Sequence, residues 1–376
     1  MKVLMCPFTD PGYLYPATSV ALELQRRGHS VTLLTDGPAA AAGAAGIGLR
    51  PAAALPVPDL FRVHRWFQAG ADQYRWVRDA VRAARPDVLV TSVLCLGPLL
   101  AAAALGLPVV VIGLACHLWP YLPGGAVAED SAQRAWRLRE CLDPYHRARE
   151  QAGLAAHQVP EDERALLGTV FLLRGHPGLE TPGSLLPEQV RHVGPCWWEP
   201  PADPAVLEPL RASIERTGKP LVYVHLARAF HEEGLWPWIE SAFSSGDFQA
   251  LVELGRSRPS QASAPDVLTV RLPWLGPLLE RADLVVSSGT SAPVLAALLH
   301  GRPLLVSPDG GEQKVLAAAC RNAGVAAALS RTTGAASLHA VARDRALHAR
   351  AGQLADALRQ TKSESLAADA VEDACR

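Results

Sequence analysis

The sequence predicts an α/β protein of two domains, each built on a parallel sheet that is covered by helices. Three observations carry this prediction. The chain opens with a strand–helix–strand pattern, a helix–strand segment occurs twice, and a proline-rich stretch lies between the two copies. The length of 376 residues agrees, because an ordinary domain has about 100–200 residues.

The first element is a short apolar strand at residues 3–6, followed by a turn at Asp10-Pro11-Gly12. Residues 16–27 carry apolar side chains at helical spacing and end before Gly28, which predicts a helix. Residues 31–35 form the next apolar run. A strand, a helix and a strand joined by short links are typical of a parallel sheet with helices on its faces.

The repeated segment comprises residues 98–112 and 293–307, which align without gaps. Each copy predicts a helix, a glycine stop and a strand. The proline that opens each copy suits the first helical turn, and Gly106 and Gly301 suit the position just after a helix. Any helix-to-strand corner of a parallel sheet has this pattern, but the distance between the copies favours two similar domains.

A proline-dense stretch without helical or strand periodicity covers residues 193–204 and predicts a linker. The expected parts are an N-terminal domain at 1–194, a linker at 195–204, a C-terminal domain at 205–360, and a C-terminal helix at 361–376 that packs back on the first domain. The second domain is expected to contain a helix at 205–216 and strands at 221–226, 250–254, 267–271, 284–287 and 304–307.

Composition and charge narrow the function. Lys and Arg number 36 and Asp and Glu 37, so the chain lacks the basic excess that favours a phosphate backbone, and we expect no nucleic-acid partner. The seven cysteines are scattered without a CxxC pair, which indicates reduced thiols in a cytoplasm. The N-terminal apolar run is too short for a signal peptide, and glycines and prolines interrupt the apolar residues 94–118, so no membrane span is expected.

Ligands of open α/β sheets bind at the carboxyl ends of the strands, where helix N-termini favour anions. Two segments occupy such places: residues 8–15, and residues 287–293 with the sequence Ser-Ser-Gly-Thr-Ser-Ala-Pro. A short turn rich in hydroxyls and glycine can hold a diphosphate through N–H and O–H donors. The alternative is that Thr290 or Ser291 only caps the helix.

The chain lacks the sequence motifs of other nucleotide-binding proteins and of metal sites. G-x-G-x-x-G and G-x-x-x-x-G-K-[ST] are both absent, which argues against dinucleotide oxidoreductases and Walker-type NTPases. The histidines occur singly, so no metal site is expected. These features indicate a nucleotide-linked transferase that works without a metal.

Seven segments, weak one by one, together resemble a known family: the GT-B glycosyltransferases that attach sugars to natural products, including antibiotics. They are residues 12–16 with 27–32, 85–90, 192–195, 219–223, 278–286 and 309–313. The resemblance covers nearly the whole chain. It implies two Rossmann-like domains facing across a cleft. It also implies an inverting, metal-independent enzyme that moves a (deoxy)sugar from a dTDP- or UDP-sugar to a small hydrophobic acceptor, with no cofactor beyond this donor.

The resemblance also assigns a donor site. It places Ser288, Gly289, Thr290 and Ser291 at the diphosphate, Glu312 and Gln313 at the sugar hydroxyls, and Trp274 and Arg228 elsewhere in this site. The chain departs from the family at five places. Two are in the donor segment, where Pro293 replaces a Thr/Ser and Ala296 replaces a glutamate. Tyr13 stands where the family has its basic histidine, Ser288 replaces a phosphate-binding histidine, and Ala227-Arg228 replaces a small Gly-Thr/Ser turn. Arg228 would supply the positive charge lost with the histidine.

The sequence therefore leaves open which residue removes the proton from the sugar acceptor. A neutral tyrosine with a pKa near about 10 is a poor base at pH 7. Asp10 can act as the base if burial raises its pKa, or it can simply form the turn before Pro11. An acceptor that ionises unaided needs no base. Further candidates for the missing base are the histidines His64, His117, His225 and His231.

Aromatic side chains of the first domain suggest where the acceptor binds. Trp66, Phe67, His117 and Trp119 would contact a flat or greasy molecule, although ordinary helix packing accounts for them equally well. Three functions remain: an active glycosyltransferase with an unusual acceptor, a catalytically silent homologue that serves as an accessory or binding protein, or another GT-B reaction that does not use a standard nucleotide sugar. Assembly as a homodimer is left open.

Overall fold

The computed structural model describes residues 1–35, 39–52, 62–117, 119, 137–154, 162–226, 234–255, 257, 259, 264–310 and 312–376. Contacts divide these residues into two compact units. The first unit comprises Met1–Gly175, Thr181–Trp198 and Lys362–Arg376, and the second comprises His176–Glu180 and Glu199–Thr361. Each unit contains one sheet, and every pair of neighbouring strands in both sheets is parallel.

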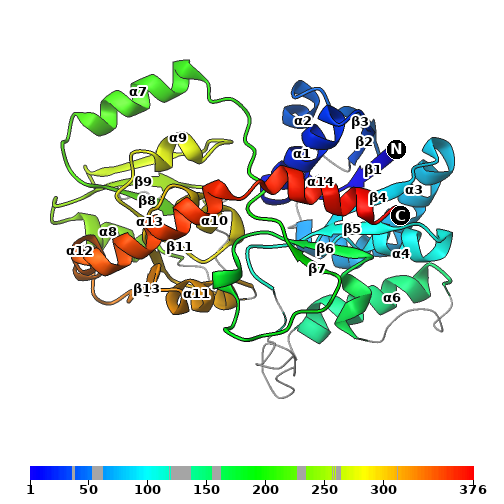
Figure 1. Cartoon of the computed structure of the whole chain (residues 1–376). Coiled ribbons are helices and arrows are strands. Elements are labelled where there is room, and N and C mark those ends of the chain that lie inside the picture. Colours follow the sequence, from blue (N-terminus) through cyan, green and yellow to red (C-terminus); the bar gives the residue numbers. More distant parts are fainter. Residues whose placement is uncertain are drawn as a thin grey trace. The chain divides into compact units, whose positions relative to one another are not determined.

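The first unit is built on a seven-stranded sheet (Figure 1). In spatial order its strands are β3 (Gly48–Pro51), β2 (Ser30–Thr35), β1 (Lys2–Cys6), β4 (Val88–Ser92), β5 (Val109–Ile112), β6 (Val170–Leu173) and β7 (Val190–His192). Its helices are α1 (Pro11–Arg26), α2 (Ala40–Ala44), α3 (Arg62–Ala84), α4 (Leu96–Leu105), α6 (Asp143–Gln151) and α14 (Ser363–Asp373), with a π-helical turn η1 (Leu138–Leu142) and a 3₁₀ turn η3 (Glu163–Leu166).

The second unit is built on a six-stranded sheet (Figure 1). Its spatial order is β10 (Val267–Val270), β9 (Gln249–Glu253), β8 (Leu221–His225), β11 (Leu284–Ser287), β12 (Leu304–Val306) and β13 (Ala326–Ala328). Its helices are α7 (Pro204–Glu215), α8 (Trp236–Phe243), α9 (Gly276–Leu279), α10 (Ser291–Leu299), α11 (Glu312–Asn322), α12 (Ala336–Arg343) and α13 (Arg345–Gln360), with a 3₁₀ turn η4 (Pro177–Leu179).

Both faces of the first sheet are buried. Side chains alternate along a strand, and in β1 Leu4 packs into a core with residues of α3, α4 and α6. Val3 and Met5 pack on the other face, with residues of α1, α2 and α14. This arrangement explains why the strands read as continuous apolar runs, as strands covered on both faces do.

The repeated segment has the expected structure in both units. It forms the corner from α4 to β5 in the first unit and from α10 to β12 in the second. Gly106 and Gly301 both adopt a left-handed conformation with φ of 65°, as expected for the residue that ends a helix. The two helices begin at Leu96 and Ser291, two residues before the prolines.

Helix α1 begins earlier than the sequence predicts. The expected turn at residues 10–12 is the first turn of the helix, which starts at Pro11 and contains Pro16. Pro11 fits because the first helical residue has no intrahelical N–H partner to lose. The backbone carbonyl of Asp10 accepts hydrogen bonds from the N–H groups of Tyr13 and Leu14, at 2.9 and 2.8 Å.

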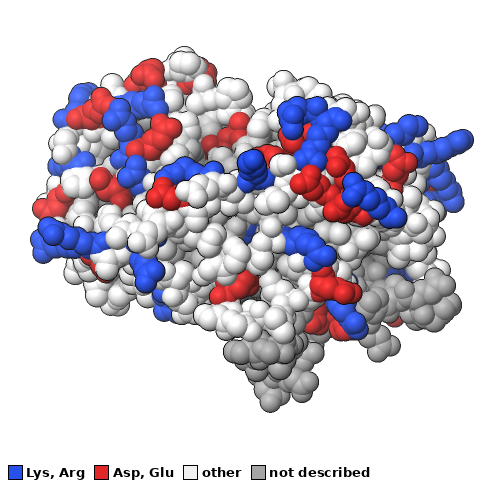
Figure 2. Space-filling model, in the orientation of Figure 1, with Lys and Arg blue, Asp and Glu red and all other residues white. Residues whose placement is uncertain are grey.

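Helix α14 belongs to the first unit and packs against α1. Arg27 forms an ion pair with Asp369 at 2.6 Å, and Glu372 lies 2.8 Å from His29. Acidic and basic side chains gather over α14 in the space-filling view (Figure 2). The units differ from the predicted domains in two respects. Residues 176–180 join the second unit, where η4 packs against α11, and the predicted linker is divided between the units after Trp198.

Candidate functional site

The hydroxyl-rich turn lies at the carboxyl end of β11, where Ser287 ends the strand and Ser291 begins α10. Gly289 lies between them with φ of 91°, a conformation that L side chains rarely adopt. A Cβ atom at this position would lie 2.8 Å from the backbone carbonyl oxygen of Gln313. Only glycine therefore fits this turn without displacing the backbone of α11.

Two hydroxyls of the turn are buried without a partner. The Ser288 Oγ and Thr290 Oγ1 atoms are shielded from solvent and form no hydrogen bond. Thr290 is the N-cap residue of α10, but its side chain makes no capping hydrogen bond. The cap alternative therefore does not explain Thr290. Buried hydroxyls normally have hydrogen-bond partners, and a buried hydroxyl without a partner costs about 1–3 kcal/mol of stability. This turn therefore has the character of a binding site.

His225 ends the neighbouring strand β8 and pairs in register with Ser287. Burial lowers the pKa of its imidazole to about 4, so the ring is neutral at pH 7. Its Nδ1 atom is buried and makes no hydrogen bond to another side chain. A neutral imidazole at this edge can donate or accept a hydrogen bond without bringing charge.

The segment at the start of α11 uses its polar groups internally. The Gln313 Oε1 atom accepts a hydrogen bond from the Asp309 N–H at 2.9 Å, and Gln313 is buried. Asp309 forms an ion pair with Arg331 at 3.2 Å. Glu312 is the first residue of α11 and is partly exposed. Of the pair assigned to sugar hydroxyls, Gln313 thus holds the loop in this structure, whereas Glu312 reaches solvent.

The remaining donor-site residues are placed differently. Trp274 is only 2% exposed, so its ring packs inside the second unit and leaves no open face for a ligand. Arg228 lies outside the described residues, as does His231.

In the first unit, Asp10 and Tyr13 lie at the carboxyl end of β1. The Asp10 side chain makes no hydrogen bond that caps α1. The Tyr13 ring packs edge-on against Phe8, with the ring centroids 5.8 Å apart. Both side chains are partly exposed.

His117 and Trp119 lie beyond the carboxyl end of β5 and are 4% and 5% exposed. The Trp119 N–H donates to His117 Nδ1 at 3.3 Å, and burial lowers the pKa of His117 to about 4. His117 is therefore neutral at pH 7. The side chains of Trp66 and Phe67, in the first turns of α3, and that of His64 lie outside the described residues.

Sequence reasoning missed Arg174, which directly follows β6 and is 2% exposed. Its signal was a charged residue at the end of an apolar run, in Val170-Phe-Leu-Leu-Arg174. A polar residue that follows a buried parallel strand lies at the edge of the sheet where ligands bind.

No protein-family model matches the chain. Among curated proteins, it is 25% identical over 359 residues to 4'-demethylrebeccamycin synthase of Lentzea aerocolonigenes, covering 84% of this chain and 85% of that protein. It is 26% identical over 189 residues to demethyllactenocin mycarosyltransferase of Streptomyces fradiae, covering 45% of this chain and 37% of that protein.

Solved structures match over the full length. The glycosyltransferase of kitacinnamycin superposes with a TM-score of 0.75 at 20% identity, covering 99% of this chain and 98% of that one. The glycosyltransferase VinC in complex with dTDP superposes with a TM-score of 0.69 at 18% identity, covering 100% and 99%. The chain has the GT-B glycosyltransferase fold. Its homologues are antibiotic glycosyltransferases, so the fold and the resemblance expected from the sequence are confirmed.

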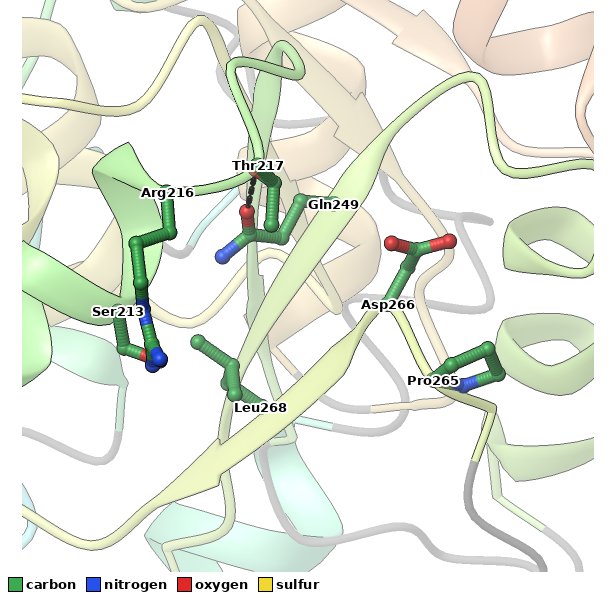
Figure 3. Close-up of a pocket in the computed structure, with 7 residues that line it drawn as sticks. All are labelled: Ser213, Arg216, Thr217, Gln249, Pro265, Asp266 and Leu268. Atoms are coloured by element: carbon green, nitrogen blue, oxygen red, sulfur yellow. Dashed lines mark hydrogen bonds between the residues drawn. The ribbon is translucent and has the colours of Figure 1, made fainter.

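A pocket of this GT-B chain lies away from the hydroxyl-rich turn (Figure 3). Gln249, the first residue of β9, and Asp266, just before β10, line it together with Arg216 and Thr217 after α7. These residues lie at the amino ends of the strands, whereas the residue 287–291 turn lies at the carboxyl end of β11. The pocket is therefore not the donor turn.

Neither a metal site nor a membrane-spanning helix is found among the described residues. They hold no cluster of three or more His, Cys, Asp or Glu side chains that could bind a metal ion. None of their helices combines the length and apolar character needed to cross a membrane.

Proposed function

We propose that the chain transfers a sugar from a nucleoside diphosphate sugar, such as a dTDP- or UDP-(deoxy)sugar, to a small natural-product acceptor. The observation that supports this proposal best is the turn at residues 287–291. It combines two unpartnered buried hydroxyls, a glycine that admits no Cβ atom, and the N-terminus of α10. Phosphate oxygens would accept hydrogen bonds from these groups and would be favoured by the helix dipole.

The proposed reaction is a single displacement with inversion. The acceptor oxygen attacks the anomeric carbon, the bond from this carbon to the diphosphate oxygen breaks, and the diphosphate leaves with the electron pair. Donors at the residue 287–291 turn stabilise the charge that grows on the leaving group. Such stabilisation needs no metal ion.

The proton of a neutral acceptor needs a base, and we assign this role to Asp10. Asp10 lies in the same turn as Tyr13, which is the position where the sequence resemblance leads us to expect a base. An acceptor that enters already ionised needs no proton transfer. The two routes differ in how the rate depends on the acidity of the acceptor.

A hydroxyl-deletion pair tests the donor site. We expect Ser288→Ala and Thr290→Val each to weaken dTDP binding about tenfold or more, because a hydrogen bond to a charged group contributes about 1.5–3 kcal/mol. Thermal unfolding should not shift downward in either variant, since neither hydroxyl makes a hydrogen bond within the fold. Titration calorimetry and thermal unfolding measure the two effects.

Thr18→Val is the matched control. The Thr18 Oγ1 atom is buried and donates to the Leu14 carbonyl oxygen at 2.9 Å in α1. This variant should therefore lose stability and keep its dTDP affinity. Unchanged dTDP binding in both Ser288→Ala and Thr290→Val would refute the donor site. Absence of dTDP and UDP binding in the wild type would favour a catalytically silent homologue.

A further inference from the structure

Arg174 is a buried cation at the carboxyl edge of the first sheet. Its side chain is among the largest that are fully buried, at 2% exposure. The Nε–H donates to the carbonyl oxygen of Gly113, just after β5, at 2.9 Å. The two terminal nitrogens form no hydrogen bond with any residue that the structure describes, so four of the five N–H donors of a guanidinium are unused.

No residue within the described part of the chain neutralises this charge, because no carboxylate forms an ion pair with Arg174. The groups that act on it electrostatically are Cys196 and Tyr13. Burial raises the pKa of Cys196 to about 12, so its thiol is neutral at pH 7. Burial lowers the pKa of Arg174 to about 10, which leaves the guanidinium charged at pH 7.

A charge that is only 2% exposed and has no ion-pair partner within the described residues is costly, because most of its hydration is lost and is not replaced. The one hydrogen bond to Gly113 does not require a charge, and an uncharged residue would fill the same space at lower cost. The charge therefore has a use that the described residues do not reveal, and an anion brought by a ligand would supply both the missing charge and acceptors for the free N–H groups.

The position of Arg174 indicates which ligand. It is close enough to Tyr13 for electrostatic interaction, and Tyr13 lies in the first turn of α1 directly after Asp10, to which the proposed function assigns the acceptor proton. Tyr13 packs edge-on against Phe8, and both Tyr13 and Leu94 pack against the small cluster of Phe8 and Cys95. Aromatic and apolar surface therefore lies around the tyrosine that interacts with the guanidinium. A flat molecule with an anionic oxygen fits this combination.

We propose that Arg174 binds the ionised hydroxyl of the acceptor, so that the acceptor class is a small molecule with an acidic phenol or enol. This inference rests on the proposed function. The guanidinium would stabilise the oxyanion in the ground state, and the same oxygen would attack the anomeric carbon while the diphosphate leaves. No proton is transferred in this step, because the acceptor binds after losing it.

4-Nitrophenol is a suitable probe, because its phenolate absorbs visible light and its phenol does not. We expect the wild-type chain to bind the phenolate at least about tenfold more tightly than the phenol, which lowers the apparent pKa of the bound probe by about 1 unit or more. Arg174→Met should abolish this preference, and Arg174→Lys should retain part of it. The probe is titrated with each variant across the pH range and followed by absorbance.

Stability separates this role from a structural one. Arg174→Met should unfold at the same temperature as the wild type or higher, because it removes an unpaired buried charge. Arg302→Met is the matched control: Arg302 donates to the carbonyl oxygens of Leu279 and Glu280 at 3.0 and 2.7 Å. This variant should lose stability and leave the phenolate preference unchanged.

The outcomes are distinct from those of the donor test. Arg174→Met should bind dTDP as the wild type does, so a failure of the donor site leaves the phenolate measurement interpretable. Equal binding of phenol and phenolate by the wild type would overturn the proposal, as would no binding of either form. A phenolate preference that persists in Arg174→Met would overturn it too.

Discussion

Single residues at the carboxyl edges of the two sheets carry polar groups that the fold does not satisfy. Ser288 and Thr290 have unpartnered hydroxyls, and Arg174 has an unpaired charge. Groups of this kind cost stability, and a structure that keeps them at the edges where ligands bind is consistent with catalysis rather than with a purely structural role.

The role of Asp10 depends on the acceptor. With an aliphatic alcohol as acceptor, Asp10→Asn should lower kcat by about 10²–10⁴, the range expected for the loss of a general base. With an acidic phenol it should change kcat little, because the nucleophile is already ionised. Steady-state kinetics with both acceptors make the comparison, and dTDP affinity should stay the same.

A substitution at an exposed carboxylate is the control for this prediction. Asp79 lies on α3 and pairs with Arg78 at the surface, at 3.0 Å. Asp79→Asn should leave kcat unchanged with both acceptors. An equal loss of kcat in Asp10→Asn for alcohols and phenols would contradict the assignment of Asp10 as a base.

Part of the site was predictable at the residue scale. The residue 287–291 turn could be predicted because hydroxyls and a glycine directly follow an apolar strand. The internal hydrogen bond of Gln313 and the burial of Trp274 could not, because both depend on how distant segments pack. Arg174 was missed for the same reason, since its burial arises where the segment after β6 meets Gly113.

At the scale of elements, the strands that the sequence predicted match the structure to within one or two residues, because their apolar runs end at glycine, proline or charged residues. Strands β3, β4, β6, β7 and β13 were not predicted. The start of α1 was wrong. Proline usually indicates a turn, and the sequence alone does not distinguish a turn before a helix from the first turn of the helix itself. Pro11 is the first residue of α1, and Pro16 lies within it.

Helix α14 offers a prediction at the same scale. Its Val371 side chain is fully buried in the core that also contains α1. Val371→Ala should lower the free energy of unfolding of the first unit by about 1–3 kcal/mol, because it deletes buried methyl groups and leaves a cavity. Denaturant unfolding of the full chain, followed by a probe in the first unit, measures the change.

Leu366→Ala is the matched control on this helix, because Leu366 is 43% exposed. Its effect should stay within about 0.5 kcal/mol. If the two variants cost the same, α14 does not stabilise the first unit through its buried face, and its ion pairs with Arg27 and His29 would be the main contacts instead.

At the scale of the whole molecule, the sequence repeat and the structure agree on two parallel-sheet units of similar construction. The relatives share only about a quarter of their residues with this chain, yet the fold matches over nearly its full length. Fold is preserved because apolar patterns and glycine stops tolerate many substitutions, whereas function depends on the few side chains at the sheet edges. Tyr13 and Ser288, where the sequence resemblance leads us to expect histidines, lie at these edges.

The central claim is that the chain binds a nucleoside diphosphate at the residue 287–291 turn. Calorimetric titration of the full chain with dTDP, and separately with UDP, tests it most directly. We predict one-site binding of at least one of the two nucleotides, with an upward shift in the unfolding temperature that grows with its concentration. The claim would be contradicted if neither nucleotide, at millimolar concentration, produced heat of binding or a shift in the unfolding temperature.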